Sequence, residues 1–94
     1  MSYTPAPIDT SGIRLPDELN ALAELIAENV HDNWSQARLS EGWQYGEKKD
    51  GEKKTTPLLV PYDQLSEEEK EYDRRTAFET LKTIVKLGYR IEKT

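Results

Sequence analysis

The sequence predicts a single small α+β domain in which two principal helices pack with a short β-hairpin and extended segments. Three observations predict this fold class. Two segments carry apolar residues at helical spacing, and the stretch between them is rich in glycine, proline and alternating aromatic residues. The third is length, because a chain of 94 residues has room for one modest core and no independent second domain.

Composition narrows the classes of function. The formal net charge is -5 and acidic residues are spread along the chain, whereas a nucleic-acid backbone is bound by a concentrated basic surface. The absence of cysteine excludes disulfides and thiolate chemistry and fits a reducing compartment. No apolar run approaches the roughly 20 residues needed to span a bilayer. We therefore expect a cytoplasmic protein whose partners include neither nucleic acid nor membrane.

Residues 1–14 are expected to form an extended arm that packs over the domain made by residues 15–94. Two prolines, Pro5 and Pro7, together with Gly12, disfavour regular structure in this segment. Tyr3 and Ile8 are its two large apolar side chains, so they are the expected anchors of the arm on the domain.

The first helix is expected to run from about residue 16 to about residue 40. Pro16 suits a first turn, and the acids Asp17 and Glu18 complement the helix dipole. At about 100° per residue, one apolar arc faces the core, with Glu24, Glu28 and Asp32 opposite. The arc contains Leu19, Leu22, Ala23, Ile26, Val30 and Ala37.

A second stripe on this helix is expected at the boundary between the apolar arc and solvent. Its members recur at intervals of three and four residues, which places them along one line of the helix. They are Ala27, His31, Trp34 and Arg38.

The middle of the chain predicts a hairpin followed by a buried extended connection. Residues 43–45 alternate as a strand does, and Asp50–Gly51 marks a turn within a polar stretch. The lysines around that turn alternate with glutamates, so a solvated turn is favoured over a phosphate site. Residues 57–62 are apolar and bracketed by prolines, which is typical of an extended segment rather than a helix.

The second helix is expected to begin near Ser66. Ser66 and Glu69 form a capping box, in which the serine accepts from the Glu69 amide while the glutamate reaches back. Gly88 is suited to end the helix, leaving Tyr89 and Ile91 to pack as a tail. The predicted core side of the helix contains Ala77, Phe78, Leu81, Ile84 and Val85.

Three stretches together resemble a known family. They are "LAELIAENVHDNW", "GWQYGEKKDGEKKTTPLLVPYDQL" and "RRTAFETLKTIVKLGY". They resemble the RyR domain, the ryanodine-receptor repeat, from about Tyr3 to Ile91. In calcium-release channels these repeats occur as tandem pairs on the cytoplasmic assembly, and single-repeat chains look like those of microbial proteins. The resemblance implies a small α+β unit and not channel activity, since the chain has no pore helices.

No catalytic or metal-binding constellation emerges from the residues. The single histidine, His31, has Asp32 beside it in sequence, but neighbouring side chains on a helix point about 100° apart. One histidine with scattered acids falls short of a zinc site. Nucleophile-elbow and phosphate-loop motifs are absent. We therefore expect no enzyme activity, no metal and no cofactor, and His31 is open to a structural role in packing or hydrogen bonding.

Planar recognition is the favoured chemistry. Trp34 and Arg38 lie one helical turn apart, so an indole face and a guanidinium can together hold a flat ring and its attached phosphate or carboxylate, with His31 as a third contact. The structural alternative has Trp34 sealing the core edge while Arg38 pairs with Glu41 or with an acid of the second helix. The remaining aromatics, Trp43, Tyr45 and Tyr62, are assigned to the core.

The expected function is thus a non-catalytic binding module that senses a small planar, nucleotide-related ligand through Trp34, Arg38 and His31. The alternative is a protein–protein interaction module with no small-molecule ligand, in which exposed aromatics and the charged hairpin recognise a partner chain. Because the channel repeats are paired, one repeat per chain also suggests a homodimer, with the two copies of Trp34 facing each other across the axis.

Overall fold

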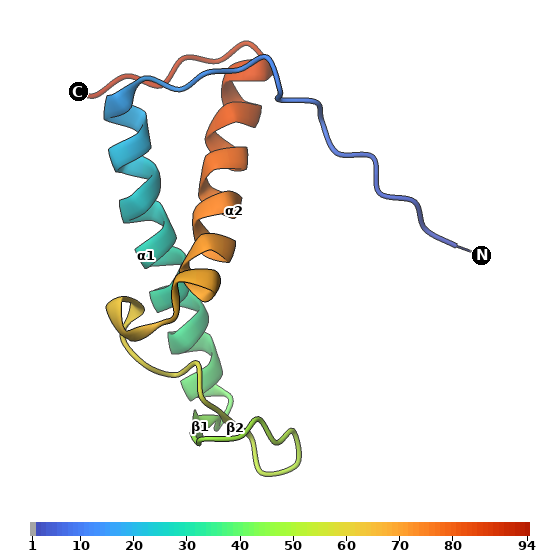
Figure 1. The fold of residues 1–94 in the computed structure, drawn as a ribbon, viewed down its shortest axis with the longest axis vertical. Helices are drawn as coiled ribbons and strands as arrows, with labels where there is room; N and C mark the ends of the chain where they lie inside the picture. Colours follow the sequence, from blue (N-terminus) through green and yellow to red (C-terminus); the bar gives the residue numbers. More distant parts are fainter. Residues whose placement is uncertain (1) are drawn as a thin grey trace.

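A computed structural model, described over residues 2–94, consists of two long helices and a compact connection between them. Helix α1 spans Asp17–Ser40 and helix α2 spans Glu67–Lys86. The connection holds strands β1 (Gln44–Tyr45) and β2 (Thr55–Thr56) and a short 3-10 helix, η1 (Tyr62–Gln64). Figure 1 shows α2 running back along the N-terminal part of α1, with the strands at the far end of α1. The α+β fold class is confirmed.

Both helices begin and end within a residue of the predicted positions. The Ser66 hydroxyl accepts the Glu69 amide at 3.2 Å, which confirms that half of the capping box. After the last turn of α2, Gly88 adopts φ +96°, a left-handed conformation that costs glycine little. The periodicity and the capping residues therefore located both helices correctly.

The predicted hairpin is wrong, because β1 and β2 pair in parallel, with Gln44 opposite Thr55. The turn after Asp50 does form, and the Asp50 carboxylate accepts the amides of Glu52 and Lys53. It closes an antiparallel bridge between Asp50 and Thr55 rather than returning the chain to β1. The chain also reverses between β1 and Asp50, and the two reversals together bring β2 into the sheet in the direction of β1.

Gly46 permits the close approach of the two strands. A Cβ atom at this position would lie 2.7 Å from the Cβ of Thr55, nearer than real Cβ contacts allow. The sheet connection therefore depends on a residue without a side chain at the end of β1.

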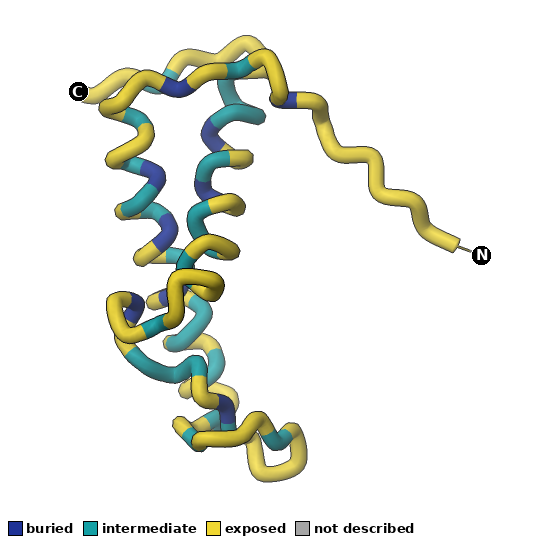
Figure 2. Tube along the Cα trace, in the orientation of Figure 1, coloured by how far each residue is buried: buried dark blue, intermediate teal, exposed yellow. Residues whose placement is uncertain are grey.

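The core lies between the facing sides of α1 and α2 and is built largely from small side chains (Figure 2). Alanines at the helix contact allow the two backbones to approach closely, and larger side chains flank them half-buried. The buried apolar residues are Leu15, Ala23, Ala27, Tyr62, Ala77 and Leu81.

The buried line of α1 is rotated from the predicted apolar arc. Ala27 and His31, expected at the boundary, are 0% and 5% exposed, whereas Ala37, expected in the core, is exposed. The close packing of α2 against Ala23 and Ala27 explains the shift, because a line of small residues admits the neighbouring helix where bulky ones would not.

One polar cluster joins α1, η1 and α2. Glu24, expected on the solvent side of α1, accepts hydrogen bonds from Arg74 Nε at 2.7 Å and from the Tyr62 hydroxyl at 3.2 Å. Arg74 also donates to Glu67 at 3.1 Å. The Arg74 hydrogen bond lowers the pKa of Glu24. Burial, with the Glu24 charge, raises the pKa of Tyr62.

The N-terminal arm leaves the body of the domain (Figure 1). Every residue from Ser2 to Asp9 is exposed, with Tyr3 at 85% and Ile8 at 48%, so the prediction that these two side chains anchor the arm is wrong. The chain instead attaches at Thr10, which is buried and donates to a Glu79 carboxylate oxygen at 2.7 Å. The division into arm and domain at residue 15 stays a prediction.

Two further expectations concern the termini and the membrane. Ile91 packs on the core as expected, but Tyr89 is 67% exposed. Within residues 2–94, neither helix combines the length and the apolar character that crossing a bilayer requires.

We predict that Leu81→Ala lowers the free energy of unfolding by about 2 to 4 kcal/mol. Leu81 is 4% exposed and lies in the helix contact, so the substitution removes apolar contacts and leaves a cavity. Urea unfolding followed by circular dichroism measures the change. Leu25→Ala, at a position 66% exposed, is the matched control and should change stability by less than about 0.5 kcal/mol.

We predict a pH-dependent contribution from Glu24. Its folded-state pKa lies below the ordinary value of 4.5, so the stabilisation is complete above that value and is lost as the pH falls through the folded-state pKa. The difference in unfolding free energy between the wild type and Glu24→Gln should therefore narrow as the pH falls below about 4.5. Parallel stability curves over this range would contradict it.

Candidate functional site

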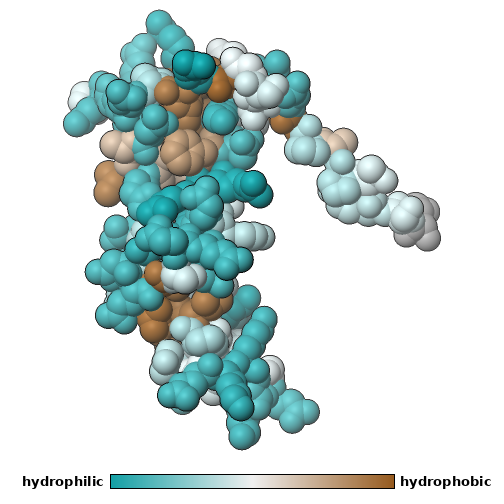
Figure 3. All heavy atoms as spheres, in the orientation of Figure 1, coloured by the Kyte–Doolittle hydropathy of each residue, from teal (hydrophilic) through white to brown (hydrophobic). Residues whose placement is uncertain are grey.

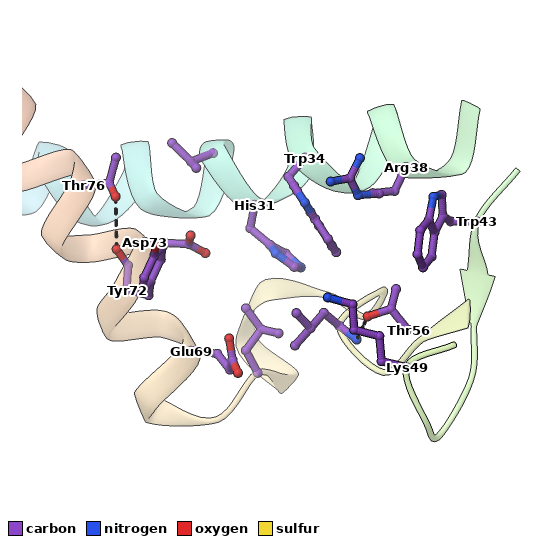
Figure 4. A pocket seen from close by; sticks show the side chains of 13 residues that line it. His31, Trp34, Arg38, Trp43, Lys49, Thr56, Glu69, Tyr72, Asp73 and Thr76 are labelled. Atoms are coloured by element: carbon purple, nitrogen blue, oxygen red, sulfur yellow. Dashed lines mark hydrogen bonds between the residues drawn. The ribbon is translucent and has the colours of Figure 1, made fainter. Parts of the chain in front are cut away.

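A groove of about 560 Å³ lies along the C-terminal half of α1. Its other walls come from the connection between β2 and α2 and from the first half of α2 (Figure 4). The lining residues are Val30, His31, Trp34, Arg38, Trp43, Lys49, Thr56, Leu58, Leu65, Glu69, Tyr72, Asp73 and Thr76. The groove thus contains all three residues that the sequence proposed for the site.

His31 forms the buried end of this set. Its Nε2 lies 2.8 Å from the carbonyl oxygen of Val60, and because a carbonyl only accepts, Nε2 carries the proton and donates. The ring also stacks on Trp34, with centroids 5.7 Å apart and planes 22° apart. His31 therefore ties α1 to the connection that forms the opposite wall, which is the structural role that the sequence left open.

Arg38 lies between the two indoles of the protein (Figure 4). Its guanidinium carbon is 5.5 Å from the ring centroid of Trp34 and 5.9 Å from that of Trp43. Guanidinium groups stack favourably on indole faces. Arg38 thus lies against Trp34, one turn away on α1, and also against Trp43, which the sequence had assigned to the core.

Apart from the two indoles, Arg38 is held in place only weakly. Among the described residues Arg38 Nη1 pairs with Glu41 at 2.8 Å, with the two side chains 38% and 55% exposed, and this is the pair that the structural alternative expected. Exposed pairs three residues apart on a helix contribute about 0.2 to 1 kcal/mol. Rotating Arg38 out of its position between the indoles therefore costs little beyond the loss of two stacking contacts.

The two ends of the groove differ in charge. Arg38 and Lys49 line one end, and Glu69 and Asp73 line the end formed by α2. Burial raises the pKa of Asp73, while charge on His31 acts in the opposite direction. A bound molecule would meet cations at one end and carboxylates at the other, with aromatic surface between them.

Sequence reasoning missed the contribution of α2. Its groove residues recur at intervals of three and four along one side of the helix, so a helical wheel identifies them as a face. The signal is present in the sequence, but acidic residues in the first turns are also typical of an ordinary solvated helix start. The residues are Glu69, Tyr72, Asp73 and Thr76.

The groove offers several groups that can bind a molecule. Across residues 2–94, no three histidine or acidic side chains come close enough together to hold a metal ion. The proton on Nε2 of His31 is already committed to a backbone carbonyl. The groove also holds stacking surfaces, two cations and two carboxylates, and such groups can orient a bound molecule.

Fold and site together define a class, a small α+β binding or interaction module. The comparison with known families agrees with this class. The chain matches the RyR domain over residues 3–93 and therefore belongs to the RyR domain family. The match covers nearly the whole chain and confirms the resemblance drawn from the sequence.

We predict that His31→Leu lowers the free energy of unfolding by about 1 to 3 kcal/mol, because the Val60 carbonyl loses its donor while apolar volume is retained. Thermal unfolding at pH 7 measures the effect. Ser35→Ala is the matched control on the same helix, since its hydroxyl is 3.4 Å from His31 Nε2 and adds little. Equal free energies of unfolding for the two variants would contradict a structural role for His31.

Proposed function

We propose that the groove binds a small planar, nucleotide-related ligand and that the protein acts as a non-catalytic sensor of it. One observation carries the proposal. A half-buried indole, Trp34, faces a second indole, Trp43, across a guanidinium that is easily displaced. Binding sites for small molecules are typically cavities of roughly 300 to 1,000 Å³ lined by aromatic surface with a few polar groups. A groove of about 560 Å³ lies within that range.

The planar ring of the ligand would take the place of Arg38 between the indoles. Arg38, released from stacking, would then pair with an anionic group of the ligand, and Lys49 at the same end of the groove would add a second cation. A phosphate suits this arrangement because a guanidinium binds it with two parallel hydrogen bonds. Arg38 would thus vacate the space between the indoles for the ring and bind the anionic group from its new position.

The remaining polar groups suit the other edge of such a ring. Glu69 and Asp73 would accept hydrogen bonds from an exocyclic amino group, which adenine, guanine and cytosine all carry. His31 would contribute as the third contact through its ring face or Nδ1, since Nε2 donates to Val60. Nucleotides occur in the cytoplasm, and a chain without cysteine fits that reducing compartment. We therefore include a cytoplasmic location in the proposal.

We predict that a nucleotide monophosphate stabilises the protein against thermal unfolding. At a hundredfold excess over the dissociation constant the gain would be about 2.7 kcal/mol. Trp34→Ala should abolish this stabilisation by removing the stacking face. Arg38→Ala should weaken the binding of nucleotides more than the binding of nucleosides, because it removes the contact with the phosphate. Differential scanning fluorimetry with adenine, guanine, cytosine and uracil nucleotides and with the corresponding nucleosides measures all three effects.

Tyr89→Ala is the matched control, since this aromatic is 67% exposed and lies outside the groove. It should respond to nucleotides as the wild type does. If no nucleotide stabilises the wild type, the ligand proposal fails and the alternative, a module that binds only protein partners, takes its place.

A further inference from the structure

We propose that the N-terminal arm, residues 2–9, docks in the aromatic groove of a second copy of this chain, so that two copies exchange arms in a homodimer. The proposal joins two features that the single chain leaves without a partner. One is an extended segment with two large apolar side chains, Tyr3 and Ile8, whose residues are all exposed. The other is an open groove lined by three aromatic rings.

The arm is an integral part of the domain but is not packed on it. The family match begins at residue 3, so it includes the arm. All side chains from Ser2 to Asp9 are nevertheless exposed, among them Tyr3 at 85% and Ile8 at 48%. Thr10 is fixed by burial and by its hydrogen bond to Glu79, so the arm leaves the body from a defined point. Figure 2 shows this segment exposed over its whole length.

The single chain is also more expanded than a compact domain. Its radius of gyration is 16.2 Å, against about 12 Å expected for a compact domain of this length. The arm accounts for much of the second-longest dimension of 42 Å, as Figure 1 shows. A second copy that receives the arm would bury surface that one chain leaves exposed.

The chemistry of the arm suits the groove. Pro5 and Pro7 restrict the segment to extended conformations of the polyproline type, so docking costs little conformational entropy. Such segments are recognised by grooves lined with aromatic rings. Trp34, Trp43 and Tyr72 provide those rings. Apolar surface is visible in two areas of the face in Figure 3, over the paired helices and lower down over the connection.

Geometry and charge indicate in which direction each arm would run along the groove of the other copy. The arm starts beside the first turn of α1, whereas the groove extends toward the strands at the opposite end of that helix. A two-fold axis perpendicular to the long dimension places each starting point next to the strand end of the other copy. Asp9 would then lie near Arg38 and Lys49 of the second copy. At about 3.1 Å per residue, the arm extends about 22 Å from Thr10 to Tyr3, which carries Tyr3 toward Tyr72.

The first test measures mass in solution without any ligand. Light scattering coupled to size exclusion should give about twice the chain mass of 10.8 kDa for the wild type. The deletion of residues 2–9 should give a monomer, and Tyr3→Ala with Ile8→Ser should weaken the dimer at least tenfold. Tyr89→Ala, which removes an exposed ring elsewhere, should leave the dimer intact. A monomeric wild type, or a dimer that survives the deletion, overturns the proposal.

The second test locates the docking site. The chain has two tryptophans, so two indole N–H signals report on the groove in a nitrogen-15 NMR spectrum. Adding a peptide of residues 2–9 to the deletion variant should move both signals, and a peptide with alanine at both proline positions should move them less. Unmoved signals overturn docking in the groove. Neither test contains a nucleotide, so failure here leaves the ligand proposal standing, and failure of the nucleotide screen leaves this one standing.

Discussion

The close contact between α1 and α2 is the constraint on which the rest of the structure depends. Alanines at 23, 27 and 77 let the helix backbones approach, and Leu81 fills the space beside them. Because so few side chains are fully buried, the contact is reinforced by a polar cluster in which Glu24 binds Arg74 and the Tyr62 hydroxyl. The same contact orients α1 so that His31 and Trp34 turn toward the connection, and the groove follows from that orientation.

The sequence predicted the elements well because their signals are local. Capping at Ser66, helix termination at Gly88 and the periodicity of the two helices involve residues within a few positions of each other. The sheet was wrong for the opposite reason. The turn at Asp50 was identified correctly, but the partner strand is set by where the chain travels afterwards, and β1 meets β2 in parallel.

The site shows the same division between local and tertiary information. Trp34, Arg38 and His31 share one helix, so their proximity followed from spacing alone. Trp43, Lys49 and the acids of α2 come from other segments, and only the packing of the two helices brings them to the groove. His31 illustrates the limit most clearly. Its wheel position suggested a boundary residue, yet it is buried, and its Nε2 donates a hydrogen bond to the carbonyl of Val60.

A small domain with a thin core can gain stability by binding, and this links the two proposals. Any occupant of the groove that binds the folded chain and not the unfolded one shifts the folding equilibrium toward the native state. An arm from a second copy and a planar ligand would both use Trp34 and the cations at its end of the groove, so they would compete. Ligand concentration would then control self-association without a change of fold. A bound ligand would exclude the arm from the groove, so the two binding equilibria would be coupled. That coupling requires only one groove with two occupants.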